Sequence, residues 1–229
     1  MCGRYAMWGV DLIGQRFLIV DPTLGFRSHF NIAPTSENPV VVSAEDGNHI
    51  RMMKWGLIHH WAKDPKFTHK PINARAESLL NKPMFRELLD CNRCIVPANG
   101  FFEWKKTDVR KEPFFIHIKD KALFGFAGLY DAWFNPDGEV VFTYSIVTTE
   151  ANEVMRPLHD RMPVILREEN EHRWLSGDHL EEADLLEILT PYSSSETIAY
   201  PVSTAVNSTT SDGIELIRPI VTLDLGYNE

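Results

Sequence analysis

Residues 94–105 read CIVPANGFFEWK, a run of apolar and aromatic residues that predicts a β-strand. Runs of the same kind, alternating or rich in β-branched and aromatic residues, recur before and after it. They lie at Pro39–Ala44, Ile50–Ile58, Pro113–Lys119, Leu123–Trp133, Val140–Thr149 and Met162–Leu166. Turn pairs such as Asp46-Gly47 and Asp137-Gly138 separate these runs, as expected for strands joined by short loops.

Helical signals are fewer and are grouped around the strands. Apolar spacing and capping residues predict helices over Asp11–Val20, Pro83–Asp90 and Glu168–Leu189, the last broken near Gly177. Strands that dominate, with helices beside them rather than in strict alternation, indicate an α+β fold. No repeat, low-complexity segment or long linker divides the chain, so we expect a single domain over residues 1–229.

Composition excludes several classes of protein. The chain has 229 residues, of which 44% are hydrophobic and 24% are charged, as in globular domains. No apolar run approaches the roughly 18–20 residues of a membrane span, and the N-terminus lacks the pattern of a secretory signal. Three cysteines are too few for a disulfide framework. We therefore expect an intracellular protein that has no membrane partner.

Charge is distributed unevenly along the chain. The net charge is −9, but residues 1–121 carry +5 and residues 122–229 carry −14. Such asymmetry is typical of a protein with a one-sided electrostatic surface, and it leaves room for an anionic ligand on the N-terminal half. A solvated acidic helical region over 168–187 explains much of the same pattern, so charge alone leaves both interpretations open.

Cys2 is the first candidate for chemistry. Removal of the initiator methionine would leave it with an amine of pKa about 7.7–8 beside a thiol of pKa about 8.5, both partly deprotonated near neutral pH. Such an aminothiol can attack an acyl carbon through sulfur. It can also condense with an aldehyde through nitrogen and then close the thiol onto the imine as a thiazolidine. The alternative is an incidental small residue at an unstructured start.

Three further polar residues stand in suggestive contexts. Glu103 lies among three aromatics, where burial would favour its protonated form and equip it as a general acid or base. His159 precedes a predicted strand and could transfer protons. Asn73 could orient a substrate hydroxyl, with Arg75 on the same strand face for a phosphate. Each also has a structural interpretation as an exposed, turn or ion-paired residue.

The pair Cys91 and Cys94 forms a CxxC motif that we do not assign to a site. A zinc site needs about four ligands, and no second cysteine or histidine pair follows at the required spacing. We therefore expect Cys94 to be buried and predict neither a metal nor an organic cofactor. Phosphate-binding, dinucleotide-binding and serine-hydrolase motifs are absent from the sequence as well.

Ten short blocks, taken in order along the chain, resemble those of one protein family. They read MCGRY (1–5), FNIAP (30–34), WGLI (55–58), NARAE (73–77), RCIVPANGFFEWKK (93–106), PFFI (113–116), FAGLYDAW (126–133), SIVTTEAN (145–152), HDRMPVIL (159–166) and PVSTAVN (201–207). As an ordered set they resemble the SRAP family, the SOS-response-associated peptidases that crosslink to abasic DNA. The resemblance implies a twisted, partly barrel-like, mainly antiparallel sheet with peripheral helices and a basic DNA channel.

The resemblance also implies roles for individual residues. The amine of Cys2 would attack the ring-opened aldehyde of an abasic site, and its thiol would close a thiazolidine. Glu103 would open the deoxyribose ring, His159 would assist proton transfer, and Asn73 would hold the sugar and the N-terminus. Contacts to single-stranded DNA are implied for Arg4, Arg75, Trp104, Pro34, Thr148, Met84, Phe85, Arg86 and Trp61. The implied protein is a monomer in the bacterial nucleoid or a eukaryotic nucleus, with slight lyase activity and self-removal of Met1.

Two departures and two rival functions accompany this resemblance. His59-His60 stands where such families often carry Pro, and Asn99 stands where an acid is commoner. Class II glutamine amidotransferases also begin Met-Cys-Gly, so an N-terminal cysteine hydrolase is one alternative. The other is a non-catalytic DNA-binding module, whose binding would not depend on Cys2.

Overall fold

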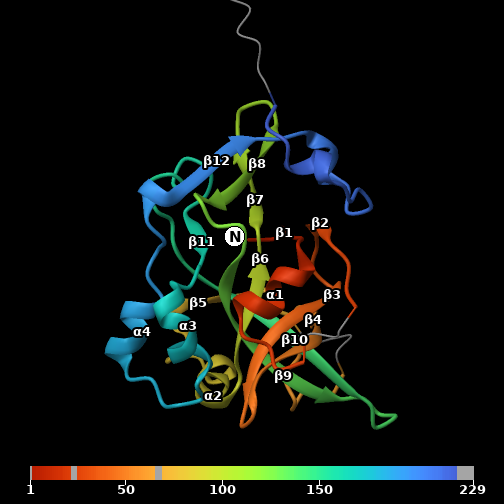
Figure 1. The fold of residues 1–229 in the computed structure, drawn as a ribbon, viewed down its shortest axis with the longest axis vertical. Coiled ribbons are helices and arrows are strands. Elements are labelled where there is room, and N and C mark those ends of the chain that lie inside the picture. The colour runs from red at the N-terminus through yellow and green to blue at the C-terminus, as the bar shows by residue number, and fades with distance from the viewer. Residues whose placement is uncertain (1, 22–24, 65–68, 221–229) are drawn as a thin grey trace, which may run out of the picture.

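Five long strands close into a ring in the computed structural model, which describes residues 2–21, 25–64 and 69–220 (Figure 1). Around the ring, each strand pairs with the next and the last pairs with the first. In order they are β10 (Val140–Glu150), β4 (Gly47–Trp55), β3 (Glu37–Ala44), β6 (Arg93–Ala98) and β9 (Phe124–Phe134). All these pairings are antiparallel except that of β10 with β4. The expected barrel-like, mainly antiparallel α+β fold is confirmed.

Two short strands extend the barrel at β10. β5 (Asn73–Arg75) pairs with it in parallel, and β11 (Arg161–Pro163) pairs with it in the antiparallel direction. A second sheet, at the top of Figure 1, runs antiparallel in the order β12 (Thr197–Pro201), β8 (Lys111–Ile118), β7 (Gly100–Lys106), β1 (Tyr5–Met7) and β2 (His29–Ile32). The start of the chain is thereby placed inside a sheet.

The prediction of one strand over Cys94–Lys105 was wrong in its number of strands, because this segment forms two. The chain leaves the barrel at the end of β6 and enters the second sheet as β7, with Asn99 between them. The side-chain amide of Asn99 is buried, and both its oxygen and its nitrogen form hydrogen bonds. The oxygen accepts from the N–H of Trp8 at 2.6 Å, and the nitrogen donates to the carbonyl of Ala122. A carboxylate could not make the second bond.

Four α-helices of the described residues lie on the outside of the sheets. They are α1 (Val10–Arg16), α2 (Pro83–Cys91), α3 (Glu168–Leu175) and α4 (Glu182–Ile188). The predicted helix over Glu168–Leu189 is interrupted as expected, and Gly177 in the gap has a φ of +73°. The predicted helix Asp11–Val20 ends early, since Leu18 adopts a φ of +51° that an α-helix excludes. Short 3₁₀ turns occupy Ala76–Ser78 (η1), Ser194–Glu196 (η2), Thr204–Asn207 (η3) and Ile214–Ile217 (η4).

Aromatic residues fill the space between the two sheets. Tyr5 on β1 donates or accepts a hydrogen bond with Tyr144 on β10 at 2.8 Å, and its ring meets Trp55 edge-on at 5.3 Å. All three side chains are essentially inaccessible to solvent. These contacts fix β1 against the barrel and therefore fix the position of Cys2, three residues before Tyr5. Within the described ranges, no helix has the length and apolar character needed to cross a membrane.

Candidate active site

Cys2 lies fully buried just before β1. The side-chain amide of Asn73 donates to the carbonyl of Cys2 at 2.8 Å, which ties β5 to the start of the chain. β5 itself is held by its parallel pairing with β10, in which Asn73 lies opposite Ile146. The other amide atom, Oδ1 of Asn73, is buried and makes no hydrogen bond to any described residue. An unused acceptor therefore faces the immediate surroundings of Cys2.

Glu103 lies on β7 with only 7% of its surface exposed. Its Oε1 accepts from the N–H of Trp104 at 3.2 Å. Burial, and then the negative charge of Glu103, raise the pKa of the Cys2 thiol from 9.0 to about 12. In the chain that still carries Met1, burial therefore favours the protonated thiol, and a partly ionised Cys2 thiol after removal of Met1 stays a prediction. The same effect places Glu103 within electrostatic reach of Cys2.

A cavity of about 420 Å³ opens beside Glu103. Basic and aromatic side chains gather around it together with the predicted histidine. Its lining residues are Arg4, Glu103, Trp104, Lys106, Lys111, Leu158, His159 and Asn207. Larger than this cavity is a groove of about 540 Å³ on α4, which contains none of the predicted site residues. The structure thus gathers Glu103, His159, Arg4 and Trp104 at one cavity.

One ring nitrogen of His159, Nδ1, has two polar contacts. Its Nδ1 accepts from the N–H of Arg161 at 3.0 Å when the ring is neutral, and it lies 2.7 Å from the carboxylate of Asp160. These two partners compete for Nδ1, because the first requires a lone pair there and the second a proton. Both leave Nε2 as the nitrogen that can exchange a proton with a molecule in the cavity.

Arg4 is anchored at the base of the same cavity. Its Nη1 donates to Oδ1 of Asn31 at 2.7 Å and to the carbonyl of Val206 at 2.9 Å. The guanidinium carbon lies 5.7 Å from the centre of the Trp104 ring, and the indole of Trp104 donates to Oδ1 of Asn207 at 2.7 Å. Burial lowers the pKa of Arg4 below its usual range, and the guanidinium remains a cation near neutral pH.

Arg75 and Thr148 lie opposite each other where β5 pairs with β10. Arg75 is exposed, as a phosphate-binding residue would be, but Thr148 is fully buried. The Thr148 hydroxyl accepts from Nε of Arg161 at 3.3 Å, and the same guanidinium forms two hydrogen bonds to Glu77, at 2.9 and 3.1 Å. Sequence reasoning missed Arg161 and Glu77, because they meet only when β11 and β5, which Glu77 follows, both pair with β10.

Four of the other predicted DNA contacts lie away from the cavity. On α2, Arg86 is exposed, Met84 is half-buried, and Phe85 packs in the core with 4% of its surface exposed. Pro34 is half-buried just after β2. The contacts of these residues with DNA stay predictions, and the burial of Phe85 makes its contact the least accessible of the four.

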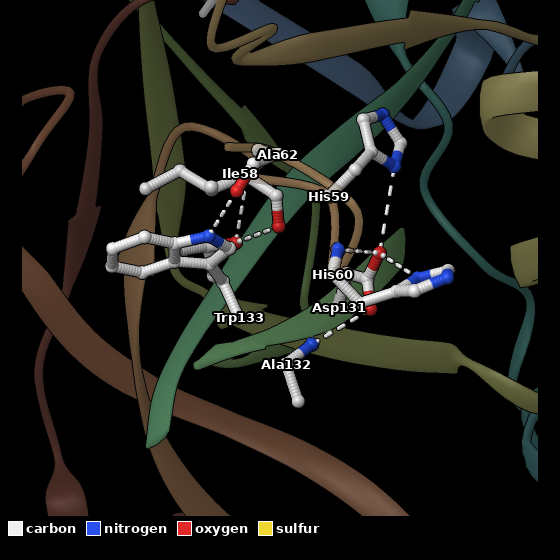
Figure 2. A network of polar contacts seen from close by, with 8 residues as sticks. Ile58, His59, His60, Ala62, Asp131, Ala132 and Trp133 are labelled. Atoms are coloured by element: carbon white, nitrogen blue, oxygen red, sulfur yellow. Dashed lines mark hydrogen bonds and ion pairs between the residues drawn. The ribbon is translucent and has the colours of Figure 1, made fainter. Parts of the chain in front are cut away.

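Trp61 follows two histidines, His59 and His60, that both contact Asp131, and Figure 2 shows these two contacts. The Asp131 carboxylate accepts from the N–H of His60 at 2.9 Å and lies 3.4 Å from Nδ1 of His59 and 3.1 Å from Nδ1 of His60. The His59 ring stacks on Trp61 with 4.9 Å between centroids and 2° between planes. Trp61 keeps 55% of its surface exposed, so the loop that departs from the family pattern presents a flat aromatic face to solvent.

The two remaining cysteines have different environments. Cys94 is fully buried, as predicted, and burial raises the pKa of its thiol. Cys91, at the end of α2, is exposed. Within the described part of the chain, no group of three or more ligand-type side chains is arranged to hold a metal ion.

The site combines the buried thiol of Cys2 with the carboxylate of Glu103 and the imidazole of His159, and the last two line a cavity with basic side chains. Such a set of groups is suited to covalent or acid–base chemistry. The profile described as SOS response associated peptidase (SRAP) matches residues 1–209. The chain therefore belongs to the SRAP family. The match covers residues 1–209, and the single domain over residues 1–229 stays a prediction.

Similar proteins agree with this membership. The protein named abasic site processing protein YoqW, of Bacillus subtilis (strain 168), is 42% identical over 222 residues, covering 95% of this chain and 99% of that protein. The protein named abasic site processing protein HMCES, of Gallus gallus, is 33% identical, covering 85% of this chain and 67% of its own length. A crystal structure of a Bacteroides thetaiotaomicron protein covers 96% of this chain and all of its own, with 27% identity and a TM-score of 0.84.

Proposed function

We propose that this protein processes abasic sites in single-stranded DNA by forming a covalent crosslink through Cys2. One observation carries the proposal: Cys2 is held by Asn73 within electrostatic reach of Glu103, next to a cavity that basic side chains line. The names of the relatives YoqW and HMCES support the substrate class. Capture of the site would shield it from strand cleavage.

Removal of Met1 frees the amine that begins the reaction. The amine of Cys2 attacks the aldehyde carbon of the ring-opened sugar, a C–N bond forms, and water leaves as the imine is made. The S–H then adds across the C=N bond, with sulfur joining carbon and the proton ending on nitrogen, to give a thiazolidine. Nitrogen acts before sulfur in this order, because the imine carbon that sulfur attacks exists only after the amine has condensed with the aldehyde.

Glu103 and His159 divide the proton transfers. Glu103 protonates the ring oxygen as the deoxyribose opens, and it accepts the thiol proton as sulfur closes on the imine. His159 assists through Nε2, since Nδ1 is engaged by the 160–161 segment. The unused Oδ1 of Asn73 accepts a hydrogen bond from a sugar hydroxyl or from the Cys2 amine.

The surrounding residues fit a single strand of DNA. Arg75 is exposed and can neutralise a backbone phosphate, while Trp104 and Trp61 offer aromatic faces to bases. An abasic gap removes the cost of unstacking the nucleotide that must enter the site. The same imine would permit slow strand cleavage by elimination, and removal of Met1 by the protein itself would be its peptidase activity.

Intact mass spectrometry with an abasic single-stranded oligonucleotide tests the proposal. We expect the wild-type protein to lack one methionine and to form a 1:1 adduct that survives heating. Cys2→Ala should form no adduct. Cys2→Ser keeps the amine and loses the thiol, so its adduct should persist only after borohydride reduction. Cys91→Ser, which changes an exposed cysteine, is the matched control and should behave as wild type.

Each rival function has its own outcome in the same experiment. A Met1-free wild-type protein that never gains the mass of DNA would overturn the proposal. If that protein instead hydrolysed glutamine, the amidotransferase-like interpretation would replace it. If Cys2→Ala bound abasic DNA as tightly as wild type and neither formed an adduct, the protein would be a non-catalytic binding module.

A further inference from the structure

Two lysines face each other across the hairpin of β7 and β8, at the rim of the cavity that Glu103 and His159 line. Lys106 on β7 is the direct register partner of Lys111 on β8. Both are exposed, and both belong to the lining of the 420 Å³ cavity. No sequence motif singles them out, because their opposition depends on the register of the hairpin.

Like charges in directly opposed positions destabilise a pair of strands. The neighbouring pair on the same hairpin avoids this, since Lys105 lies opposite Glu112, and Glu112 also forms an ion pair with Arg110 at 3.0 Å. For Lys106 and Lys111 no ion pair is formed with any carboxylate of the described residues. Lys106 and Lys111 thus lack the carboxylate that Lys105 has opposite it. Two positive charges without such a partner point to an anion from outside the protein.

Other features of the cavity favour a phosphate as that anion. Nη1 of Arg4, also at this cavity, already donates to Asn31 and Val206, so part of its hydrogen-bonding capacity serves the fold. Side chains two apart on a strand share a face, which places Trp104 on the side of Lys106, and Lys105 is not part of the cavity lining. Two residues span about 6.6 Å along a strand, a spacing that suits the base and the phosphate of one nucleotide.

We propose that Lys106 and Lys111 together clamp a single phosphate of the nucleotide next to the abasic site. The clamp rests on the proposed function for its ligand, a DNA backbone phosphate, and adds a subsite that fixes the strand relative to Cys2. It acts through charge rather than base edges, so it is indifferent to sequence.

The dependence of binding on salt measures the clamp without any covalent step. In a Cys2→Ala background with intact single-stranded DNA, the logarithm of affinity falls linearly with the logarithm of salt concentration. Lys106→Gln combined with Lys111→Gln should lower the magnitude of that slope by about 0.7, the value for one phosphate on a single strand. Lys105→Gln is the matched control on the opposite face and should change the slope by less than half as much.

A scan of uncharged phosphates locates the subsite. Oligonucleotides with one methylphosphonate at each position around the abasic site are bound to the Cys2→Ala protein and to the double glutamine variant in the same background. At one position within two nucleotides of the abasic site, the methylphosphonate should weaken binding to Cys2→Ala and leave binding to the double variant unchanged. Thermal unfolding of each variant checks that folding is intact.

Three results would overturn the clamp. They are an unchanged salt slope in the double variant, an equal loss in Lys105→Gln, and methylphosphonate effects that are the same in both proteins at every position. None of these depends on adduct formation. A wild-type protein that binds DNA through the clamp and forms no adduct would overturn the proposed function and leave the clamp standing.

Discussion

At the scale of single residues, the three cysteines differ chiefly in their access to solvent. Cys2 and Cys94 are buried, and burial raises the pKa of both thiols, that of Cys2 to about 12. Cys91 is exposed. Since the thiolate is the reactive form, a buried neutral thiol reacts slowly with soluble reagents.

Thiol counting under native conditions tests this difference. With a disulfide reagent near pH 8, we expect one of the three thiols to react quickly and two to react only after denaturation. Cys91→Ser should abolish the fast phase, and Cys2→Ala should leave it unchanged. A fast phase of two thiols in the wild-type protein, reduced to one by Cys2→Ala, would contradict the protected state of Cys2.

At the scale of elements, the chain is closely packed at the start of β7, where β6 gives way to β7. A Cβ atom added to Gly100 would lie 2.1 Å from Cζ of Phe115 and 2.7 Å from both Cε atoms of that ring. Phe115 lies on β8 with its side chain buried, so the ring has little room to yield. The first residue of β7 is therefore limited to glycine by packing rather than by backbone conformation.

Gly100→Ala should lower the free energy of unfolding by about 1–3 kcal/mol, the usual cost of an extra group in a packed core. Urea unfolding followed by tryptophan fluorescence would measure it. Gly25→Ala is the control, since nothing lies within 4 Å of a Cβ built there, and it should be close to neutral. Combining Gly100→Ala with Phe115→Leu should be less destabilising than the sum of the two changes; a strictly additive result would show that the two positions do not clash.

The long elements were predictable and the short ones were not. Runs such as Leu123–Trp133 carry enough alternation or β-branched content to identify β9 and its neighbours. β1, β5 and β11 have three residues each, too few for any period, and they exist because other strands pair with them. The run Ile50–Ile58 is broken after Trp55, where Gly56 adopts a φ of +123°.

The same division holds for the site. Cys2 could be predicted from its position in the chain and Glu103 from its aromatic neighbours. In the structure the charge of Glu103 is close enough to affect the Cys2 thiol. Lys106, Lys111 and Arg161 depend on strand register, which a sequence without known pairings does not supply. Thr148 and Phe85 were expected at the DNA from the resemblance, but both side chains are buried, so their contacts with DNA stay predictions.

At the scale of the whole molecule, several ionisable groups are buried in their neutral forms between the two sheets. Burial raises the pKa of Tyr5 and Tyr144 as well as that of the Cys2 and Cys94 thiols. For Cys2 the folded value is about 12 against 9.0 for the exposed group. The unfolded chain thus ionises first as pH rises, and stability that is fully present below pH 9 is lost above it.

Denaturation at a series of alkaline pH values measures this loss. Between about pH 9.5 and 11, Cys2 alone should contribute a fall of about 1.4 kcal/mol per pH unit to the free energy of unfolding. Guanidinium unfolding of the wild type and of Cys2→Ala should therefore show a steeper decline for the wild type by that amount. Parallel curves would mean that the Cys2 thiol titrates alike in both states.

The contact between Arg4 and Val206 has a consequence for biosynthesis. The two residues are 202 positions apart in the chain, and the guanidinium of Arg4 donates to the Val206 carbonyl at 2.9 Å. At about 5–20 residues per second, the ribosome makes Arg4 roughly 10–40 s before Val206. Cys2 and Arg4 are among the first residues translated, yet the segment that anchors Arg4 is among the last. A nascent or truncated chain therefore carries Cys2 and Arg4 before the anchor of Arg4 has been made.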